Sequence, residues 1–327
     1  MPITNDQYLS IYRNMLTSRK LEERIMELYM DGKTPVFDLA AGILPGEMHL
    51  SYGQEAVAAM CENLTENDWV HAGHRPHAIA IACGVDLKGM AAELLGKKEG
   101  LSGGRGGHMH IYDRSVNFAS SSIIGEQMPA AVGFAMAAKA RGDNSIAVSL
   151  IGDGAANQGT FHESLNFAAV QKLPYVCIVE DNNWAVTTSK AQSTAIARNS
   201  DRAAAYGIPG EYVEGNNLER ILEATGKAFD YVREGNGPFV LEIETFRMMG
   251  HFHPDPAPMV PQEEKDSWVD CVAACRESIL LQGVLPEAEL EQLETEVIAE
   301  VEDALTFAIE ADYPAPEEAL ERVFASN

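Results

Sequence analysis

One stretch, residues 146–185, constrains the fold of this 327-residue sequence more than any other. Two short apolar runs rich in β-branched residues, 147–151 and 175–179, are bounded by turn-forming residues, which is typical of buried strands. Residues 159–172 between them are compatible with a helix, and Pro174 closes that segment. The stretch predicts a right-handed β-α-β unit, so we expect an α/β fold with a parallel sheet flanked by helices.

Polar residues directly follow both predicted strands. Gly152, Asp153 and Gly154 come after the first strand, and Asn182 comes just after the second. Because the carboxyl ends of parallel strands face one crevice, we expect the Asp153 carboxylate and the Asn182 amide to converge. Mg²⁺ prefers oxygen ligands, and glycines let the backbone approach a phosphate. The sequence therefore predicts a metal and diphosphate site.

Other interpretations of the same glycines fit less well. Two unrelated turns would explain either motif alone, but not their pairing across one β-α-β unit. The glycines at 152, 154 and 159 have the wrong spacing for a dinucleotide fingerprint, and no Gly-Lys-Ser/Thr follows as in a Walker A loop.

Composition excludes several classes of protein. Apolar runs are too short for a membrane helix, and the first residues show no signal-peptide pattern. The five cysteines form no C-x-x-C pair, so we expect a reducing, cytoplasmic location. A net charge of −25 disfavours nucleic acid as a partner, since phosphate binding needs a basic face. A solvated acidic surface, a high-salt host and a basic partner all remain compatible with this charge.

The string GDGAANQGTFHESLNFAAVQKLP, followed by Asn182, resembles the thiamine diphosphate motif of the E1 α subunits of 2-oxo acid and acetoin dehydrogenases. The resemblance extends from about Tyr8 to past Asp255. It implies the diphosphate-binding half of a thiamine diphosphate fold, with thiamine diphosphate and Mg²⁺ as cofactors. The resemblance assigns the metal to Asp153, Asn182 and the main-chain carbonyl of Trp184, and places the cofactor beside Gly152, Gly154 and Ala155.

Three histidines gain a role only from this resemblance. HLSYGQEA is similar to the family's H-L-x-x-G-Q-E-A segment, which places His49 at the substrate end of the site. His74 and Arg75 match a pair that contacts the cofactor, with the arginine on the diphosphate, and His77 matches a further histidine near the pocket. A zinc site is disfavoured because the histidine spacings in residues 71–77 suit no standard pattern.

Two further segments resemble cofactor-binding loops of the family. In the glycine-rich loop 100–127, Ser122 and Ile124 match positions that hold the aminopyrimidine ring, although Ser122 replaces a glycine. In FRMMGHFHPDP, Arg247 matches an arginine on the diphosphate, and His251 a histidine beside the thiazolium. Phe252 and Pro254 stand where kinase-regulated relatives carry serines, so phosphorylation at these two positions is excluded. The role of His253 stays open.

The resemblance implies an E1 α subunit that passes an acetyl unit to a lipoyl-bearing E2, with His251, His49 and His77 as candidate catalytic residues. The run HRPHAIAIACGVDLKGMAAE favours the acetoin branch, with pyruvate as the neighbouring substrate. The glutamate that activates the pyrimidine would come from an E1 β subunit in an α2β2 heterotetramer. A branched-chain E1 α subunit, a non-catalytic cofactor-binding subunit and a Mg²⁺-dependent phosphate-ester hydrolase are the alternatives.

We expect residues 1–265 to form the thiamine diphosphate-binding domain, and residues 266–327 to form an acidic, helical extension packed on it. Apolar residues recur near heptad spacing in the extension, at Leu290, Leu293, Val297, Val301 and Leu305. A helix packed on the core is the favoured interpretation of this pattern, and an assembly interface is the second.

Overall fold

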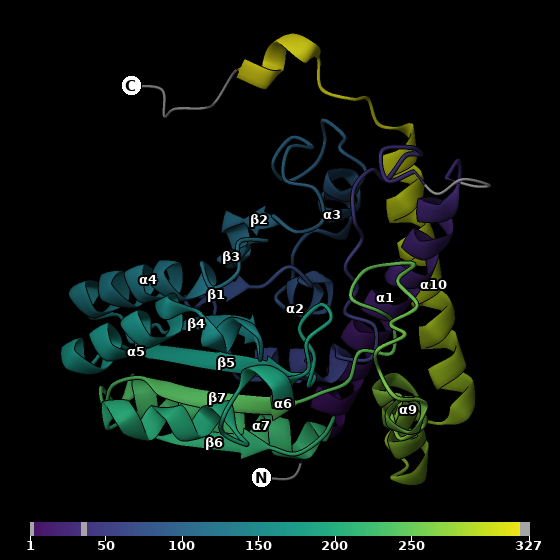
Figure 1. The fold of residues 1–327 in the computed structure, drawn as a ribbon. Coiled ribbons are helices and arrows are strands. Elements are labelled where there is room, and N and C mark those ends of the chain that lie inside the picture. Colours follow the sequence, from purple (N-terminus) through teal and green to yellow (C-terminus); the bar gives the residue numbers. More distant parts are fainter. Residues whose placement is uncertain (1–2, 34–37, 321–327) are drawn as a thin grey trace.

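The computed structural model describes residues 3–33 and 38–320, and it contains a seven-stranded sheet in the order β2-β3-β1-β4-β5-β7-β6 (Figure 1). All pairs in this sheet are parallel except β2 with β3, so the predicted α/β fold with a parallel sheet is confirmed. The strands are β1 (Trp69–Ala72), β2 (Tyr112–Asp113), β3 (Phe118–Ser120), β4 (Ala147–Gly152), β5 (Tyr175–Asp181), β6 (Gly210–Val213) and β7 (Phe239–Glu244).

Helices cover both faces of the sheet and one of its ends. The α-helices are α1 (Asn5–Met30), α2 (His77–Ala82), α3 (Leu87–Leu94), α4 (Gln127–Arg141), α5 (Gly159–Gln171), α6 (Lys190–Ser193), α7 (Leu218–Arg233), α8 (Gln262–Asp266), α9 (Cys271–Leu281) and α10 (Glu287–Glu310). The 3₁₀ helices are η1 (Glu55–Asn63), η2 (Arg114–Val116), η3 (Ala155–Asn157), η4 (Asn199–Tyr206) and η5 (Pro316–Leu320).

The predicted β-α-β unit corresponds to β4, α5 and β5, whose bounds differ from the expected ones by two residues or fewer. Capping side chains stabilise the starts of two helices. Ser189 and Gln192 form a capping box at the start of α6. At the start of α9, the Asp270 carboxylate accepts hydrogen bonds from the main-chain N–H groups of Val272 and Ala273.

Alternating residues of the central strands pack into two apolar cores. Val148 and Leu150 of β4 face the larger core with α1, α3, α7 and α10, whereas Ala147 and Ile151 face α4 and α5. Figure 1 shows α4 and α5 together over one face of the sheet. The sheet is therefore buried on both faces, as its almost uniformly apolar strands require.

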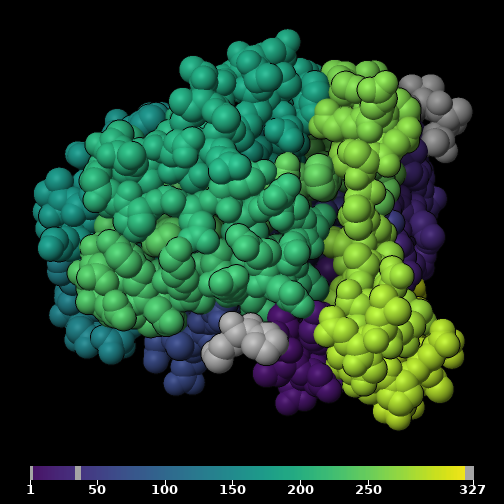
Figure 2. All heavy atoms as spheres, turned by 90° about the horizontal axis from the view of Figure 1, so that it is seen from below, coloured from purple at the N-terminus to yellow at the C-terminus, as the bar shows by residue number. Residues whose placement is uncertain are grey.

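The C-terminal helices lie against the N-terminal helix. α10 packs on α1 and α3, and α9 packs on α1, which Figure 2 shows as the yellow-green segment beside the purple one. Four of the heptad-spaced residues, Leu290, Val297, Val301 and Leu305, are at most 2% exposed, and Leu293 is partly buried. This burial supports the core-packing interpretation of the pattern. No helix in the described part of the chain is long and apolar enough to cross a membrane.

The strand register determines which strand ends lie side by side at one edge of the sheet. Gly152 at the end of β4 pairs with Glu180, and Asp181 at the end of β5 pairs with Glu244. On the other side of β4, β1 and β3 end together, since Ala72 pairs with Ser120. The loops that follow these strands therefore meet at one edge of the sheet.

Candidate functional site

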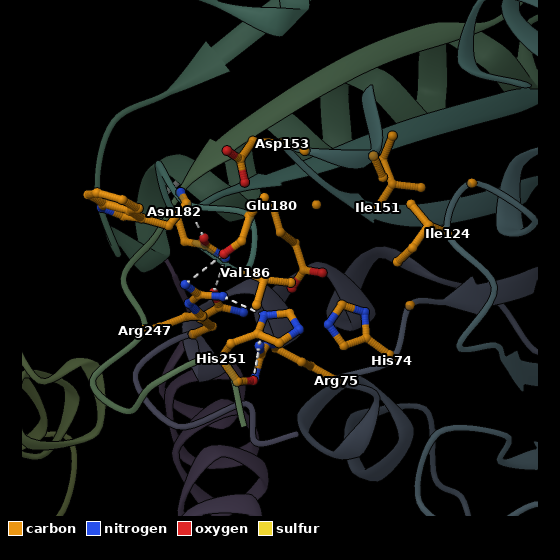
Figure 3. A pocket seen from close by; sticks show the side chains of 18 of the residues that line it. His74, Arg75, Ile124, Ile151, Asp153, Glu180, Asn182, Val186, Arg247 and His251 are labelled. Atoms are coloured by element: carbon orange, nitrogen blue, oxygen red, sulfur yellow. Dashed lines mark hydrogen bonds between the residues drawn. The ribbon is translucent and has the colours of Figure 1, made fainter. Parts of the chain in front are cut away.

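A cavity of about 250 Å³ opens at the carboxyl edge of the sheet (Figure 3). Its wall comes from the loops that follow β1, β3, β4, β5 and β7. The residues proposed from the sequence that line it are His74, Arg75, Ile124, Gly152, Asp153, Gly154, Ala155, Asn182, Trp184, Arg247 and His251. Segments more than 170 residues apart in the chain thus form one site, as His74 and His251 illustrate.

Three residues proposed from the sequence do not line this cavity. The Ser122 hydroxyl is 2.8 Å from Nε2 of His110. His77 is fully buried, with its Nδ1 2.8 Å from Oε1 of Glu22, so it lies in an internal hydrogen-bond network. His49 is also buried, but its ring packs edge-on against two rings of the cavity wall, those of His74 and His251.

The end of the cavity beside Asp153 carries oxygen atoms that could bind a metal. Asp153 is 2% exposed, and burial together with the nearby Asp181 raises the pKa of its carboxyl group to about 7. Oδ1 of Asn182 accepts a hydrogen bond from the main-chain N–H of Trp184 at 3.3 Å, which folds this loop around the amide. A buried carboxylate beside an amide oxygen is a donor set that suits a hard cation such as Mg²⁺.

The backbone beside Asp153 leaves room for a ligand. A Cβ atom added at Gly152 would meet no atom within 4 Å, so the cavity wall is open at this point. A Cβ atom at Gly154 would approach Cβ of Ala185 to 3.1 Å, so glycine keeps the two loops in close contact. These glycines and the arginines described next fit a diphosphate group.

Arg75 and Arg247 converge on one nitrogen of His251. Nδ1 of His251 is 3.2 Å from an Nη atom of Arg75 and 3.0 Å from an Nη atom of Arg247. Guanidinium nitrogens can only donate, so Nδ1 is the acceptor and the proton of the neutral ring is on Nε2. Burial and the two cations lower the pKa of His251 to about 3, so the ring is neutral at physiological pH.

Ring nitrogens of His49, His74 and His251 lie within 4.8 Å of one another, a spacing compatible with a metal site. The tautomer of His251 argues against this use, because a protonated Nε2 has no lone pair for a metal. The two guanidinium groups would also repel a cation. The histidine end of the cavity, shown in Figure 3 away from Asp153, is therefore built for hydrogen bonding.

Sequence reasoning missed three polar residues of the cavity wall, Gln54, Gln127 and Glu180. Oε1 of Gln54 accepts a 2.7 Å hydrogen bond from Nδ2 of Asn182. Burial raises the pKa of Glu180 to about 7, and the nearby Arg75 opposes that rise. All three lie in segments already singled out, which was the available signal: the GQEA motif, the loop 100–127 and the end of the second strand. His253 does not line the cavity: its ring packs edge-on against Tyr29.

The fold and the cavity define an α/β protein with a candidate ligand site at the carboxyl edge of its sheet, and comparisons with known proteins specify the family. Residues 13–317 match the model of the family described as "Dehydrogenase E1 component". The chain therefore belongs to the dehydrogenase E1 component family, as its motifs predicted.

Relatives named after two different substrates are similar to all or nearly all of the chain. The α subunit of an acetoin:2,6-dichlorophenolindophenol oxidoreductase from Cupriavidus necator is 38% identical over 331 residues, covering 100% of this chain and 96% of the relative. Its namesake from Bacillus subtilis is 36% identical with the same coverage. The pyruvate dehydrogenase E1 component α subunit of Rhizobium meliloti is 37% identical over 305 residues, covering 92% of this chain and 85% of the relative.

Proposed function

We propose that this chain is the α subunit of a thiamine diphosphate-dependent E1 dehydrogenase, which cleaves acetoin or decarboxylates pyruvate and passes the acetyl unit to a lipoyl-bearing E2. One observation carries the proposal: a single cavity joins Asp153 and Asn182 to Arg75, Arg247 and His251. Oxygen ligands at one end and a cationic hydrogen-bonding cluster at the other suit a metal-bound diphosphate cofactor whose reactive ring reaches the histidines.

Each end of the cavity would hold one part of the cofactor. Asp153, Asn182 and the main-chain carbonyl of Trp184 would bind Mg²⁺, and the guanidinium groups of Arg75 and Arg247 would bind the diphosphate oxygens. Ile124, whose side chain lines the cavity, would pack against the aminopyrimidine. When bound, thiamine diphosphate supplies the electron sink that stabilises a carbanion at the substrate carbonyl carbon.

The side chains of His251, Arg75 and Arg247 would then orient the substrate and hold a proton near it. His251 presents an Nε2–H donor toward the substrate oxygen, and the two arginines hold its ring by Nδ1. Because its pKa is lowered to about 3, His251 donates a hydrogen bond without becoming a permanent cation. Arg75 is further fixed by hydrogen bonds to the main-chain carbonyls of Leu50 and His251, so the donor geometry exists before substrate arrives.

A partner subunit is part of the proposal. Ile124 and Val186 line the cavity but are 48% and 49% exposed, and Ile123 beside them is 62% exposed. Apolar side chains exposed around a ligand site are typical of a surface that another protein covers. We propose that an E1 β subunit covers this side in an α2β2 heterotetramer and supplies the glutamate for the pyrimidine. The five free cysteines agree with a cytoplasmic location.

The substrate is tested by reconstituting the chain with its β subunit and measuring kcat/KM for acetoin, pyruvate and 3-methyl-2-oxobutanoate. We expect acetoin or pyruvate to be preferred over the branched acid, because the similar proteins compared above are named for acetoin and pyruvate. Extra methylenes are worth about 1–3 kcal/mol each, so a ten- to hundredfold preference is expected. Preference for the branched acid would contradict the substrate assignment, and the absence of any turnover would favour a non-catalytic subunit.

A further inference from the structure

A buried lysine joins the two ends of the loop that follows β5, residues 182–189. Lys190 is the first residue of α6, and its Nζ donates to Oδ2 of Asp181, the last residue of β5. The same Nζ donates to Oε1 of Glu242 on β7 at 2.9 Å. Lys190, Asp181 and Glu242 are 8%, 3% and 0% exposed. Because buried ion pairs are screened little by salt and water, these contacts fix the end of the loop to the sheet.

The ammonium group of Lys190 is a cation that two neighbouring carboxylates share. The second oxygen of each carboxylate has a different donor. Oδ1 of Asp181 accepts from the main-chain N–H of Asn183 at 3.1 Å. Oε2 of Glu242 accepts from the main-chain N–H of Ser200 at 2.8 Å and from its hydroxyl at 3.0 Å. Without Lys190, two negative charges would therefore be left beside each other in the interior, which destabilises the segments that carry them.

Main-chain hydrogen bonds connect Lys190 to the cavity wall. Its own N–H donates to the carbonyl of Asn183 at 2.8 Å, and the N–H of Ala185 donates to the carbonyl of Thr188 at 2.9 Å. These two bonds make the loop a narrow hairpin. Four residues of the hairpin line the cavity, namely Asn182, Trp184, Ala185 and Val186. A displacement of Lys190 would therefore be transmitted to this wall.

The other end of α6 contacts the segment that follows β4. Oγ1 of Thr194 accepts from Nδ2 of Asn157 at 3.0 Å, and Oδ1 of Asn157 accepts from an Nη atom of Arg202 at 2.6 Å. These contacts are exposed to water, whereas those of Lys190 are buried, so Lys190 is the stronger of the two anchors of α6.

We propose that Lys190 is a positioning residue of the metal site, and that its contacts with Asp181 and Glu242 hold loop 182–189 in its cavity-lining conformation before any ligand binds. The inference rests on the proposed function, in which Asn182 and the main-chain carbonyl of Trp184 would bind Mg²⁺. Charge alone would act in the opposite direction, since a cation near the site repels Mg²⁺. The sign of the change in Mg²⁺ affinity when Lys190 is removed therefore separates positioning from charge.

Two substitutions of Lys190 test this sign in the complex reconstituted with the β subunit. We expect Lys190→Met to raise the Kd for Mg²⁺ about tenfold, because it leaves buried carboxylates unpaired and releases the loop. Lys190→Arg keeps a cation that can donate to both carboxylates, so its Kd should stay within about threefold of the parent. The measurement is calorimetric titration with Mg²⁺ at fixed thiamine diphosphate. Lys227→Met is the matched control, because it removes an exposed lysine of α7 that pairs with Glu211.

Hydrogen exchange in the chain without metal or cofactor measures the loop directly. The main-chain N–H groups of residues 185, 190 and 194 donate to carbonyls within the loop and α6. We expect these amides to be protected in the parent and in Lys190→Arg, and to exchange faster in Lys190→Met. Amides of β4 and α10 should exchange at the parent rate in every variant, which would show that the change is local. This measurement needs no ligand, so it does not depend on the proposed function.

Unchanged or tighter Mg²⁺ binding in Lys190→Met would overturn the positioning role, as would a loss of protection that extends to β4 and α10. If Lys190→Met does not fold, the double variant Lys190→Met/Asp181→Asn replaces it. The double variant removes one charge of each sign and keeps an oxygen for the N–H of Asn183. Parent-like Mg²⁺ affinity in that variant would also overturn the inference. A parent complex that binds no Mg²⁺ with thiamine diphosphate would instead contradict the proposed function, so the two failures are distinguishable.

Discussion

Asn182 and Gln54 are joined by a 2.7 Å hydrogen bond, although 128 residues separate them in the chain. Nδ2 of Asn182 is the donor and Oε1 of Gln54 the acceptor, which leaves Oδ1 of Asn182 as the atom available to a cation. Gln54 immediately precedes η1, so the start of this helix orients a side chain that follows β5. An amide fixed in this way offers its oxygen to a metal without first rotating.

We expect Gln54→Leu to weaken Mg²⁺ binding. Losing one net hydrogen bond costs about 1 kcal/mol, which corresponds to roughly a fivefold higher Kd for Mg²⁺. Gln54→Glu keeps an acceptor oxygen and should bind more tightly than Gln54→Leu. The measurement is a Mg²⁺ titration of tryptophan fluorescence at fixed thiamine diphosphate. Gln292→Leu, an exposed glutamine of α10 that contacts Glu296, is the control. Wild-type affinity in Gln54→Leu would show that Gln54 does not orient Asn182.

Asp153→Ala should abolish retention of thiamine diphosphate. The substitution removes the buried carboxylate that would bind Mg²⁺, and the diphosphate would then lose the metal that helps to hold it. Cofactor that remains with the protein after gel filtration in Mg²⁺ is the measurement. Asp303→Ala, which removes an exposed carboxylate of α10 paired with Lys88, should retain cofactor like the parent. If Asp153→Ala also retains it, the metal site has been assigned to the wrong carboxylate.

The isolated chain should show no measurable decarboxylation of pyruvate or cleavage of acetoin. Its sheet supplies one cofactor cavity with exposed apolar residues at its side, and the proposed glutamate for the pyrimidine lies on the β subunit. Dye reduction by the purified chain, before and after a β subunit is added, tests this. Turnover by a homogeneous preparation of this chain alone would refute the heterotetramer.

Acid should destabilise the protein through its buried histidines. The folded-state pKa of His108 is lowered to about 3, below its ordinary value of about 6.5, so between these pH values the unfolded chain binds more protons. The stability contributed by neutral His108 is complete above pH 6.5 and is lost as the pH falls toward 3. We therefore expect the drop in Tm between pH 7 and pH 4.5 to be smaller in His108→Gln than in the parent. An equal drop in both would contradict the lowered pKa, and His162→Gln provides the comparison at an exposed site.

The sequence by itself determined the central β-α-β unit and the residues at its strand ends. Short apolar runs, turn residues and the closing Pro174 depend on neighbours within a few positions, so β4, α5 and β5 could be predicted from residues 146–185. Because β4 and β5 are parallel neighbours, the residues that follow them lie close together at one edge of the sheet. Asp153 and Asn182 therefore line the same cavity.

Tertiary structure decided which distant side chains complete the site. Nothing local to Gln54 indicates Asn182 as its partner, and nothing local to His108 indicates His49. It also placed His77 in a buried network with Glu22 instead of on the cavity wall. Such contacts depend on how η1, the glycine-rich loop and α1 pack against the sheet, and that packing is a property of the whole core. The tautomer of His251 follows from it, because a neighbour's donor or acceptor, and not the residue type, selects the nitrogen that carries the proton.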